Sequence, residues 1–257
     1  MSATQPILHD RHHAILSSFA LSNVLLAFDF DGTLVPIDAK PEGVAMRNGT
    51  RRLLITVAGL YPCVVISGRR LDDIAARLAG IPVWHVFGNH GLESSAASAH
   101  PTAQTRKWVR KLTQDLASHQ GVVVEDKGLS VTVHYRGAHD RPKAIEAIES
   151  IETAIRGLPG ARIVGGKEAV NLLPFGGADK GVALRDALRL FACQTAIYVG
   201  DDDTDEDAFA AAGPHQLLGI HVGPARSSAA RFHVESQVEI DMLLEALIDV
   251  RIHQHAK

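Results

Sequence analysis

Cysteine is scarce in this sequence. Only Cys63 and Cys193 occur among 257 residues, and each lies in an apolar stretch. Two such residues cannot form the disulfide framework of a small secreted domain, and they do not have the spacing of a zinc site. We therefore expect two buried free thiols.

Basic residues are not in excess, and no long apolar run is present. Lys and Arg (26) against Asp and Glu (29) give a formal net charge of -3, so no overall basic field attracts nucleic acid or anionic lipid. The apolar stretch at 14–28 is interrupted by polar residues and follows no basic segment, and no other run approaches the roughly 20 apolar residues of a membrane span. We expect a cytoplasmic protein with neither nucleic acid nor a membrane as its partner.

The apolar residues fall instead into short runs. These runs, at 24–30, 63–67, 83–87, 195–200 and 216–222, have the length of buried strands, and helical patterns lie between several of them. This rhythm predicts an α/β fold in which a parallel sheet carries helices on both faces. A chain of 257 residues can bury one such core and one inserted unit.

The pattern changes between about 101 and 174, where it indicates a helix, two strands, a helix and two more strands. Apolar and polar residues alternate at 129–135, so one face of that strand can pack while the other could meet a ligand. We predict an α+β cap, residues 98–175, inserted into a core of residues 1–97 and 176–257. Glycines near its ends could act as hinges: Gly88, Gly91, Gly176 and Gly177.

Two carboxylates lie at the end of the first predicted strand. Asp29 and Asp31 leave the sheet at its carboxyl edge, where α/β proteins bind ligands. Strand alternation would point both side chains the same way, and two like charges so close favour a bound cation such as Mg²⁺. The same residues could instead cap the turn that follows, with Gly32 adopting a positive φ.

A second acidic cluster follows another predicted strand. In the segment 200–207 all residues except Gly200 and Thr204 are acidic. Such a cluster could simply begin a solvated helix, since acidic residues favour the first helical turn. Two acidic clusters at the same edge of a sheet make a metal site the better interpretation.

Groups that could hold a phosphate occur in the same pattern. Ser67 ends the second predicted strand beside Gly68, where a hydroxyl and backbone N–H groups can bind phosphate oxygens, although Ser67 could also be an ordinary helix cap. Lys180 lies at the start of a predicted helix, where the helix dipole disfavours a cation. A bound anion at that position would explain the lysine.

Together these residues resemble the haloacid dehalogenase (HAD) superfamily of phosphatases. Four elements carry the resemblance, in the order found in that superfamily: Asp29-x-Asp31-Gly-Thr, Ser67, Lys180, and Gly200-Asp201-Asp202 with Asp205. The resemblance implies a HAD-like Rossmannoid parallel-sheet core with an inserted α+β cap.

The same resemblance implies a catalytic role for each of these residues. Asp29 would attack phosphorus and form an aspartyl-phosphate, and Asp31 would be the general acid and then the general base. Ser67 and Lys180 would hold the phosphate. The implied cofactor is Mg²⁺, with these ligands: Asp29, the backbone carbonyl of Asp31, Asp201, and Asp202 or Asp205 as further ligands or as residues that orient them.

The inserted segment and its borders resemble the trehalose-6-phosphate phosphatase family within this superfamily. The matching motifs are Val64-Val65-Ile66-Ser67-Gly68-Arg69, Gly88-Asn89-His90-Gly91, Lys127-Gly128-Leu129-Ser130, His134-Tyr135-Arg136, Gly166-Lys167 and the segment 200–209. They span nearly the whole chain and imply a sugar phosphate, trehalose 6-phosphate, as the substrate. The residues implied to contact the sugar or its phosphate are Arg69, His90, Glu125, Lys127, Lys167 and Asn171.

Asn171 departs from the family pattern, which usually has a glutamate at this position. Asparagine can donate and accept hydrogen bonds but carries no charge. Another sugar phosphate, such as sucrose phosphate or a glycosyl-glycerate phosphate, is therefore an alternative substrate. A catalytically idle sugar-phosphate sensor is an alternative of another class, but Asp31 argues against it because a binding module needs no proton-transfer group.

Overall fold

The computed structural model describes residues 3–37, 43, 45–94, 102–138 and 141–254. The chain divides into two compact units. Unit 1 comprises Met1–Ser95 with Ala178–Lys257, and unit 2 comprises Ala96–Gly177. The predicted boundary between residues 97 and 98 lies outside the described residues, and the role of the insertion as a cap stays a prediction.

Unit 1 is built on an eight-stranded sheet with the order β1-β12-β11-β10-β2-β3-β4-β5. Its strands are β1 (Gln5–Pro6), β2 (Val24–Phe28), β3 (Cys63–Ile66), β4 (His85–Gly88), β5 (Glu93–Ser94), β10 (Thr195–Gly200), β11 (Leu217–Val222) and β12 (Phe232–Val234). All neighbours are parallel except β4 and β5. The predicted α/β fold with a parallel main sheet is confirmed.

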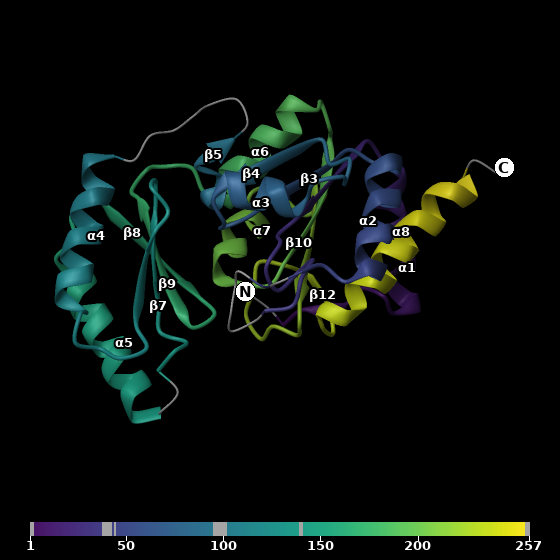
Figure 1. Cartoon of the computed structure of the whole chain (residues 1–257). Helices are drawn as coiled ribbons and strands as arrows, with labels where there is room; N and C mark the ends of the chain where they lie inside the picture. The colour runs from purple at the N-terminus through teal and green to yellow at the C-terminus, as the bar shows by residue number, and fades with distance from the viewer. Residues whose placement is uncertain (1–2, 38–42, 44, 95–101, 139–140, 255–257) are drawn as a thin grey trace. The chain divides into compact units, whose positions relative to one another are not determined.

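Helices cover both faces of this sheet (Figure 1). Along β2, Val24, Leu26 and Phe28 enter one hydrophobic cluster, while Leu25 and Ala27 enter a second one. A strand buried on both faces must be apolar at every position, which explains the unbroken apolar runs of the sequence. The first cluster packs α1 (His13–Leu21), α2 (Asn48–Leu60), α3 (Leu71–Arg77) and α8 (Ile240–Gln254), and the second packs α6 (Lys180–Leu190) and α7 (Glu206–Phe209).

The strand order reverses direction between β2 and β10. From β2 the chain proceeds through β3 to β4 on one side, whereas β10, β11 and β12 follow one another on the other side. Ligands of open α/β sheets bind beyond the carboxyl ends of the strands at such a switch point. The residues that follow β2 and β10 are therefore the first place to look for a site.

Unit 2 has its own antiparallel sheet and core. The elements follow the predicted order: α4 (Ala103–Asp115), β6 (Val123–Asp126), β7 (Val131–His134), α5 (Arg141–Arg156), β8 (Ala161–Gly166) and β9 (Ala169–Pro174). The sheet has the order β6-β7-β9-β8. Trp108 and Leu112 of α4 pack with Val131, Val133 and Leu172 on one face of this sheet, so the alternation at 129–135 sets the packed face as expected.

One expectation, that both thiols are buried, needs correction. Cys63 is buried, but Cys193 is only partly so, because it follows the end of α6 at the rim of the second cluster. Gly88 lies in β4, and Gly91 lies in a short 3₁₀ helix, η3 (Asn89–Gly91), where a Cβ would collide with the backbone of Asp179. These two glycines are close-packing positions within unit 1, and the hinge role of the four glycines stays a prediction. Among the described residues, no helix is both long and apolar enough to cross a membrane.

Candidate active site

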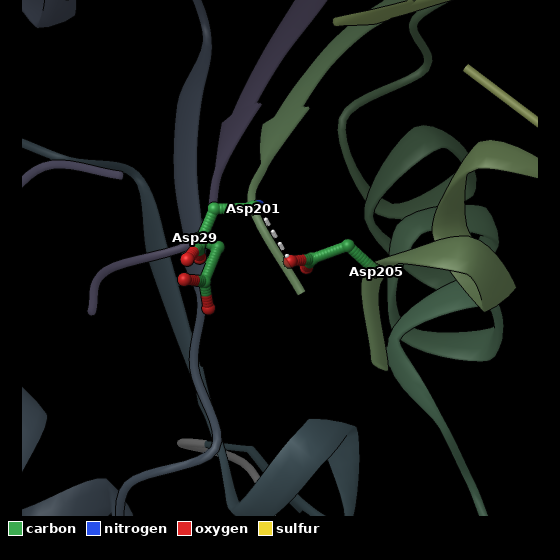
Figure 2. A group of neighbouring side chains, drawn as sticks. All are labelled: Asp29, Asp201 and Asp205. Carbon is green, nitrogen blue, oxygen red and sulfur yellow. Dashed lines mark hydrogen bonds between the residues drawn. The ribbon is translucent and has the colours of Figure 1, made fainter. Parts of the chain in front are cut away.

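Three carboxylates meet at the switch point. Asp29 directly follows β2, and Asp201 directly follows β10, whose Val199 pairs with Phe28. Asp205 reaches the same place from the 3₁₀ helix η4 (Asp203–Asp205) (Figure 2). Each of the three buried residues offers an oxygen, and these oxygens lie within 4.8 Å of one another. Such a donor set suits a hard divalent cation.

Gly32 allows the loop after β2 to approach this group. Its φ is +87°, and a Cβ there would collide with the carboxylate of Asp201. Glycine adopts this conformation without the steric penalty that other residues meet. The close approach of the two loops therefore depends on this residue, and a side chain here would displace Asp201.

Lys180 bridges two of the carboxylates. Its Nζ donates to Asp29 Oδ1 and to Asp205 Oδ1, both at 2.7 Å. Lys180 begins α6, and Asp179 caps this helix by accepting a hydrogen bond from the backbone N–H of Val182. The helix dipole disfavours a cation at this end, and these carboxylates are anions that offset it. Burial by itself would lower the pKa of Lys180, but attraction by Asp205 and Asp29 outweighs burial and raises it.

The electrostatics of Asp29 favour a further cation. Burial raises the pKa of Asp29 well above its usual value, Lys180 opposes this shift, and repulsion by Asp205 and Asp201 adds to it. One ammonium group thus faces three carboxylates in a buried space. A divalent cation would offset the remaining charge and favour the ionised form of Asp29.

Asp205 orients its neighbours. Its Oδ2 accepts hydrogen bonds from the backbone N–H groups of Asp201 and Asp202, both at 2.9 Å, and its Oδ1 accepts from the hydroxyl of Tyr198 at 2.6 Å as well as from Lys180. Asp202 caps η4 by accepting from the backbone N–H of Asp203. Local bonds therefore engage both oxygens of Asp205. Sequence reasoning missed Tyr198, because nothing distinguishes it from other apolar-run residues of β10.

Asp31 has a different environment from Asp29. Its Oδ2 and Oδ1 accept hydrogen bonds from Arg69 Nε and Nη2, both at 2.7 Å. The side chain of Asp31 is 39% exposed, whereas Asp29 is buried. The expectation that the side chains of Asp29 and Asp31 point the same way rested on strand alternation, but β2 ends at Phe28. Alternation therefore does not extend to Asp31, and the two carboxylates have different partners.

Ser67 and His90 lie at the ends of β3 and β4. Ser67 is buried, its hydroxyl accepts from the backbone N–H of Arg69 at 3.1 Å, and its carbonyl accepts from that of His90 at 2.9 Å. Asn89, His90 and Gly91 have consecutive positive φ values of 53°, 59° and 99°. Such conformations are costly for residues other than glycine and cluster at functional sites. The ring of His90 packs against Gly68.

The remaining predicted residues lie in unit 2. Glu125, Thr132 and Asn171 are cross-strand neighbours on β6, β7 and β9, so they share one face of the sheet. The hydroxyl of Thr132 donates to Asn171 Oδ1 at 2.9 Å. Lys127 follows β6, and Lys167 lies in the turn between β8 and β9. The face opposite the hydrophobic core therefore carries polar and charged groups.

Glu125 is held by two basic partners. Its Oε2 lies 2.8 Å from His134 Nε2 and 3.6 Å from Lys127 Nζ. Burial would raise the pKa of Glu125, but the hydrogen bond from His134 and the charge of Lys127 outweigh burial and lower it to about 2. Glu125 is therefore an anion at any physiological pH, and the position of its carboxylate is fixed.

Solved structures share this fold. A phosphatase of the HAD superfamily from Bacteroides thetaiotaomicron matches with a TM-score of 0.62 and 16% identity, covering 90% of this chain and 96% of that one. The C-terminal domain of trehalose-6-phosphate phosphatase from Candida albicans matches with a TM-score of 0.82 and 20% identity, covering 97% of this chain and 99% of that one. The chain has the fold of the HAD superfamily.

Sequence comparison defines the family. The family model described as trehalose-phosphatase matches residues 27–239. The trehalose-phosphate phosphatase of Mycobacterium tuberculosis (strain H37Rv) is 35% identical over 231 residues, which cover 83% of this chain and 58% of that protein. The chain belongs to the trehalose-phosphatase family, as the motifs predicted, and it spans about 58% of the length of this curated relative.

Proposed function

We propose that this chain is a Mg²⁺-dependent phosphatase that hydrolyses trehalose 6-phosphate to trehalose and phosphate. One observation carries the proposal: Asp29, the first carboxylate of the family motif, lies buried at the switch point between Lys180 and Asp201. The Mycobacterium relatives bear the name trehalose-phosphate phosphatase, which supports the choice of sugar. We place this activity in the cytoplasm, as the sequence predicts.

Asp29 is the proposed nucleophile. Its carboxylate would attack phosphorus, the bond from phosphorus to the sugar oxygen would break, and an aspartyl-phosphate would form. Lys180, which holds one oxygen of Asp29, would also stabilise the charge on the transferring phosphoryl group, and the hydroxyl of Ser67 would bind a phosphate oxygen. Burial of these groups keeps water away and strengthens each electrostatic contact.

Asp31 is the proposed proton-transfer group. It would protonate the sugar oxygen as that oxygen leaves, and it would then accept a proton from the water that hydrolyses the aspartyl-phosphate. Its partial exposure suits this role, because the group must exchange protons with the substrate and with water. Arg69 would hold it between these steps.

Asp29 and Asp201 are the proposed ligands of Mg²⁺, together with the backbone carbonyl of Asp31. The bound ion would neutralise phosphate charge in the transition state. Asp205 has both oxygens engaged by local hydrogen bonds, and Asp202 caps η4, so we assign both the task of holding the loop that carries Asp201.

The polar face of the unit 2 sheet is the proposed sugar site. Glu125, Lys127 and Asn171 would bind sugar hydroxyls through charged and amide groups, with Lys167 at the edge. The neutral Asn171 keeps open a second candidate, hydrolysis of another sugar phosphate such as sucrose phosphate or a glycosyl-glycerate phosphate. A glutamate at this position should increase the preference for trehalose 6-phosphate.

A phosphate-release panel tests the proposal. The purified chain would be assayed with trehalose 6-phosphate, sucrose phosphate and glucose 6-phosphate, with Mg²⁺ and with excess chelator. We expect Mg²⁺-dependent release that is fastest from trehalose 6-phosphate. Faster release from another sugar phosphate would identify that compound as the substrate in place of trehalose 6-phosphate. No release from any compound would favour the hypothesis of a catalytically idle sugar-phosphate sensor.

The Asp29→Asn variant tests the nucleophile. We expect turnover to fall by at least about 10³-fold, because an amide cannot form the phosphoenzyme. Asp241→Asn is the control, since Asp241 accepts from Arg47 and Thr50 in unit 1 without touching the carboxylate group. Retained activity in Asp29→Asn would refute the nucleophile assignment.

A further inference from the structure

Four side chains of alternating charge run from Asp31 into α3. Arg69 binds both oxygens of Asp31, its Nη1 donates to Asp73 Oδ2 at 2.8 Å, and Arg77 Nε donates to Asp73 Oδ1 at 2.8 Å. Asp73 lies in the first turn of α3, and Arg77 ends that helix. All four residues belong to unit 1. The proposed proton-transfer group is thus linked to α3 through one intervening side chain, Arg69.

The guanidinium of Arg69 is constrained on two edges. One edge, Nε with Nη2, faces Asp31, and Nη1 faces Asp73. Because the group is planar and its donors have fixed directions, a bond at Nη1 determines where the other edge points. The Arg69 side chain is only 12% exposed, and its Cζ lies 5.8 Å from the ring centroid of Phe30, next to Asp31. Little room remains for another orientation.

We propose that Asp73 is a positioning residue for the proton-transfer step, acting through Arg69 on Asp31. The inference rests on the proposed function. Both oxygens of Asp31 are bound to Arg69, so one of them must turn to the substrate when it protonates the departing sugar oxygen. In that step the phosphorus–oxygen bond breaks, Asp29 bonds to phosphorus, and Asp31 is left as a carboxylate. Asp73 keeps Arg69 in place during this movement, so the carboxylate returns to the same position.

A purely structural role of Asp73 predicts a different outcome. An acidic residue in the first turn of a helix and an i,i+4 pair with an arginine both stabilise helices. Asp72 provides the comparison, because it lies in the same first turn and pairs with Arg70, at 3.1 Å, instead of Arg69. A substitution at Asp72 removes the same charge from the same turn and leaves Arg69 untouched.

The experiment compares Asp73→Ala with Asp72→Ala on two substrates in the presence of Mg²⁺. Trehalose 6-phosphate has a leaving oxygen that must be protonated, whereas the leaving group of p-nitrophenyl phosphate departs as a stable anion. The ratio kcat/KM covers binding and the steps up to departure of the leaving group, so its comparison between the two substrates reports the protonation by Asp31.

We expect Asp73→Ala to lower kcat/KM for trehalose 6-phosphate by about tenfold and that for p-nitrophenyl phosphate by less than about twofold. Asp72→Ala should change neither value by more than about twofold. Asp73→Asn, which keeps an acceptor oxygen for Arg69, should recover part of the loss. If Asp73→Ala does not fold, the ratio between the two substrates in Asp73→Asn decides the matter.

Equal losses on both substrates, or the same loss in Asp72→Ala, would overturn the inference and leave Asp73 a structural residue. A wild-type chain that releases phosphate from p-nitrophenyl phosphate but not from trehalose 6-phosphate would instead refute the proposed substrate. In that case the same comparison is made with the sugar phosphate that the panel selects.

Discussion

Burial and neighbouring charge both shift the pKa values of carboxyl groups in this chain, but which of the two dominates differs from one group to another. At Asp29 burial outweighs the attraction of Lys180, and two more carboxylates add to the upward shift of the pKa. At Glu125 the partners His134 and Lys127 outweigh burial, and the pKa falls to about 2. A bound cation would therefore stabilise the ionised form of Asp29, whereas the partners of Glu125 already stabilise its ionised form.

Glu125 should give unit 2 a stability that depends on pH. Its pKa is lowered in the folded chain, so its contribution is complete above the ordinary value of 4.5 and is lost as the pH falls toward about 2. Because the side chain is 44% exposed, solvent screening limits the effect to about 1 kcal/mol. The difference in thermal unfolding midpoint between the wild type and Glu125→Gln should therefore shrink between pH 5 and pH 3, values chosen to bracket most of this range.

Glu152→Gln is the control for this prediction. Glu152 forms an exposed pair with Arg156 in α5 at 3.6 Å, and such pairs contribute little. If the difference in unfolding midpoint between the wild type and Glu125→Gln stays constant across this pH range, the assigned role of Glu125 is contradicted.

The two thiols should differ in reactivity. Burial raises the pKa of Cys63 to about 12 and also raises the pKa of Cys193, but Cys193 is only partly buried. Since the thiolate is the reactive form, we expect a maleimide to label Cys193 slowly in the native chain and Cys63 at least about tenfold more slowly still. Mass spectrometry of the labelled peptides measures both, and equal labelling in urea is the control. Native labelling of Cys63 first would show that β3 is accessible.

At the scale of elements, β10 fixes the loop that follows it through Tyr198. The hydroxyl of Tyr198 donates to Asp205 at 2.6 Å, and Asp205 in turn holds Lys180 and the backbone of Asp201. Removing the hydroxyl should let Asp205 shift and disturb both groups. We expect Tyr198→Phe to lower kcat for phosphate release by about tenfold with little change in fold.

Tyr61→Phe is a matched control, because it also removes a buried hydroxyl of unit 1. The hydroxyl of Tyr61 donates to the carbonyl of Leu247 at 2.7 Å, remote in sequence from the carboxylate loops. Its loss should cost about 1 kcal/mol of stability and leave turnover unchanged. Equal activity losses in the two variants would mean that Tyr198 contributes only to packing.

The central strands could be predicted because each is buried on two faces, but the end of β2 could not. The predicted run extends past Asp29 to Phe30, whereas β2 stops at Phe28. The loop that follows has bonds of its own, such as the one from Gly32 N–H to the carbonyl of Val35. The edge strands β1 and β5 have only two residues each, too few to form a pattern.

The residues of the candidate site also fall into those that the sequence could locate and those that it could not. Asp29, Asp201 and Lys180 could be located because each lies where a strand ends or a helix begins. Asp73 and Tyr198 could not, because their importance lies in partners, Arg69 and Asp205, that only the folded chain brings to them. Sequence patterns report burial and element ends, whereas side-chain partners depend on rotamers and loop geometry.

At the scale of the whole molecule, each unit has its own hydrophobic core, and the proposed cation site lies entirely in unit 1. A cation that binds only the folded state stabilises it by an amount that grows with the logarithm of its concentration, about 2.7 kcal/mol at 100 times the Kd. The proposed ligands Asp29 and Asp201 directly follow β2 and β10. A cation bound to both would hold the ends of these two strands together, so this stabilisation should belong to unit 1.

Mg²⁺ should therefore raise the thermal unfolding midpoint and slow amide hydrogen exchange in β2 and β10 more than in β7 and β9 of unit 2. Chelator should reverse both effects. Asp201→Asn should abolish them, since the site loses a charged ligand, while Asp241→Asn should retain them because Asp241 pairs with Arg47 elsewhere in unit 1. Equal protection of both sheets, or an unchanged response in Asp201→Asn, would place the cation somewhere other than at Asp29 and Asp201.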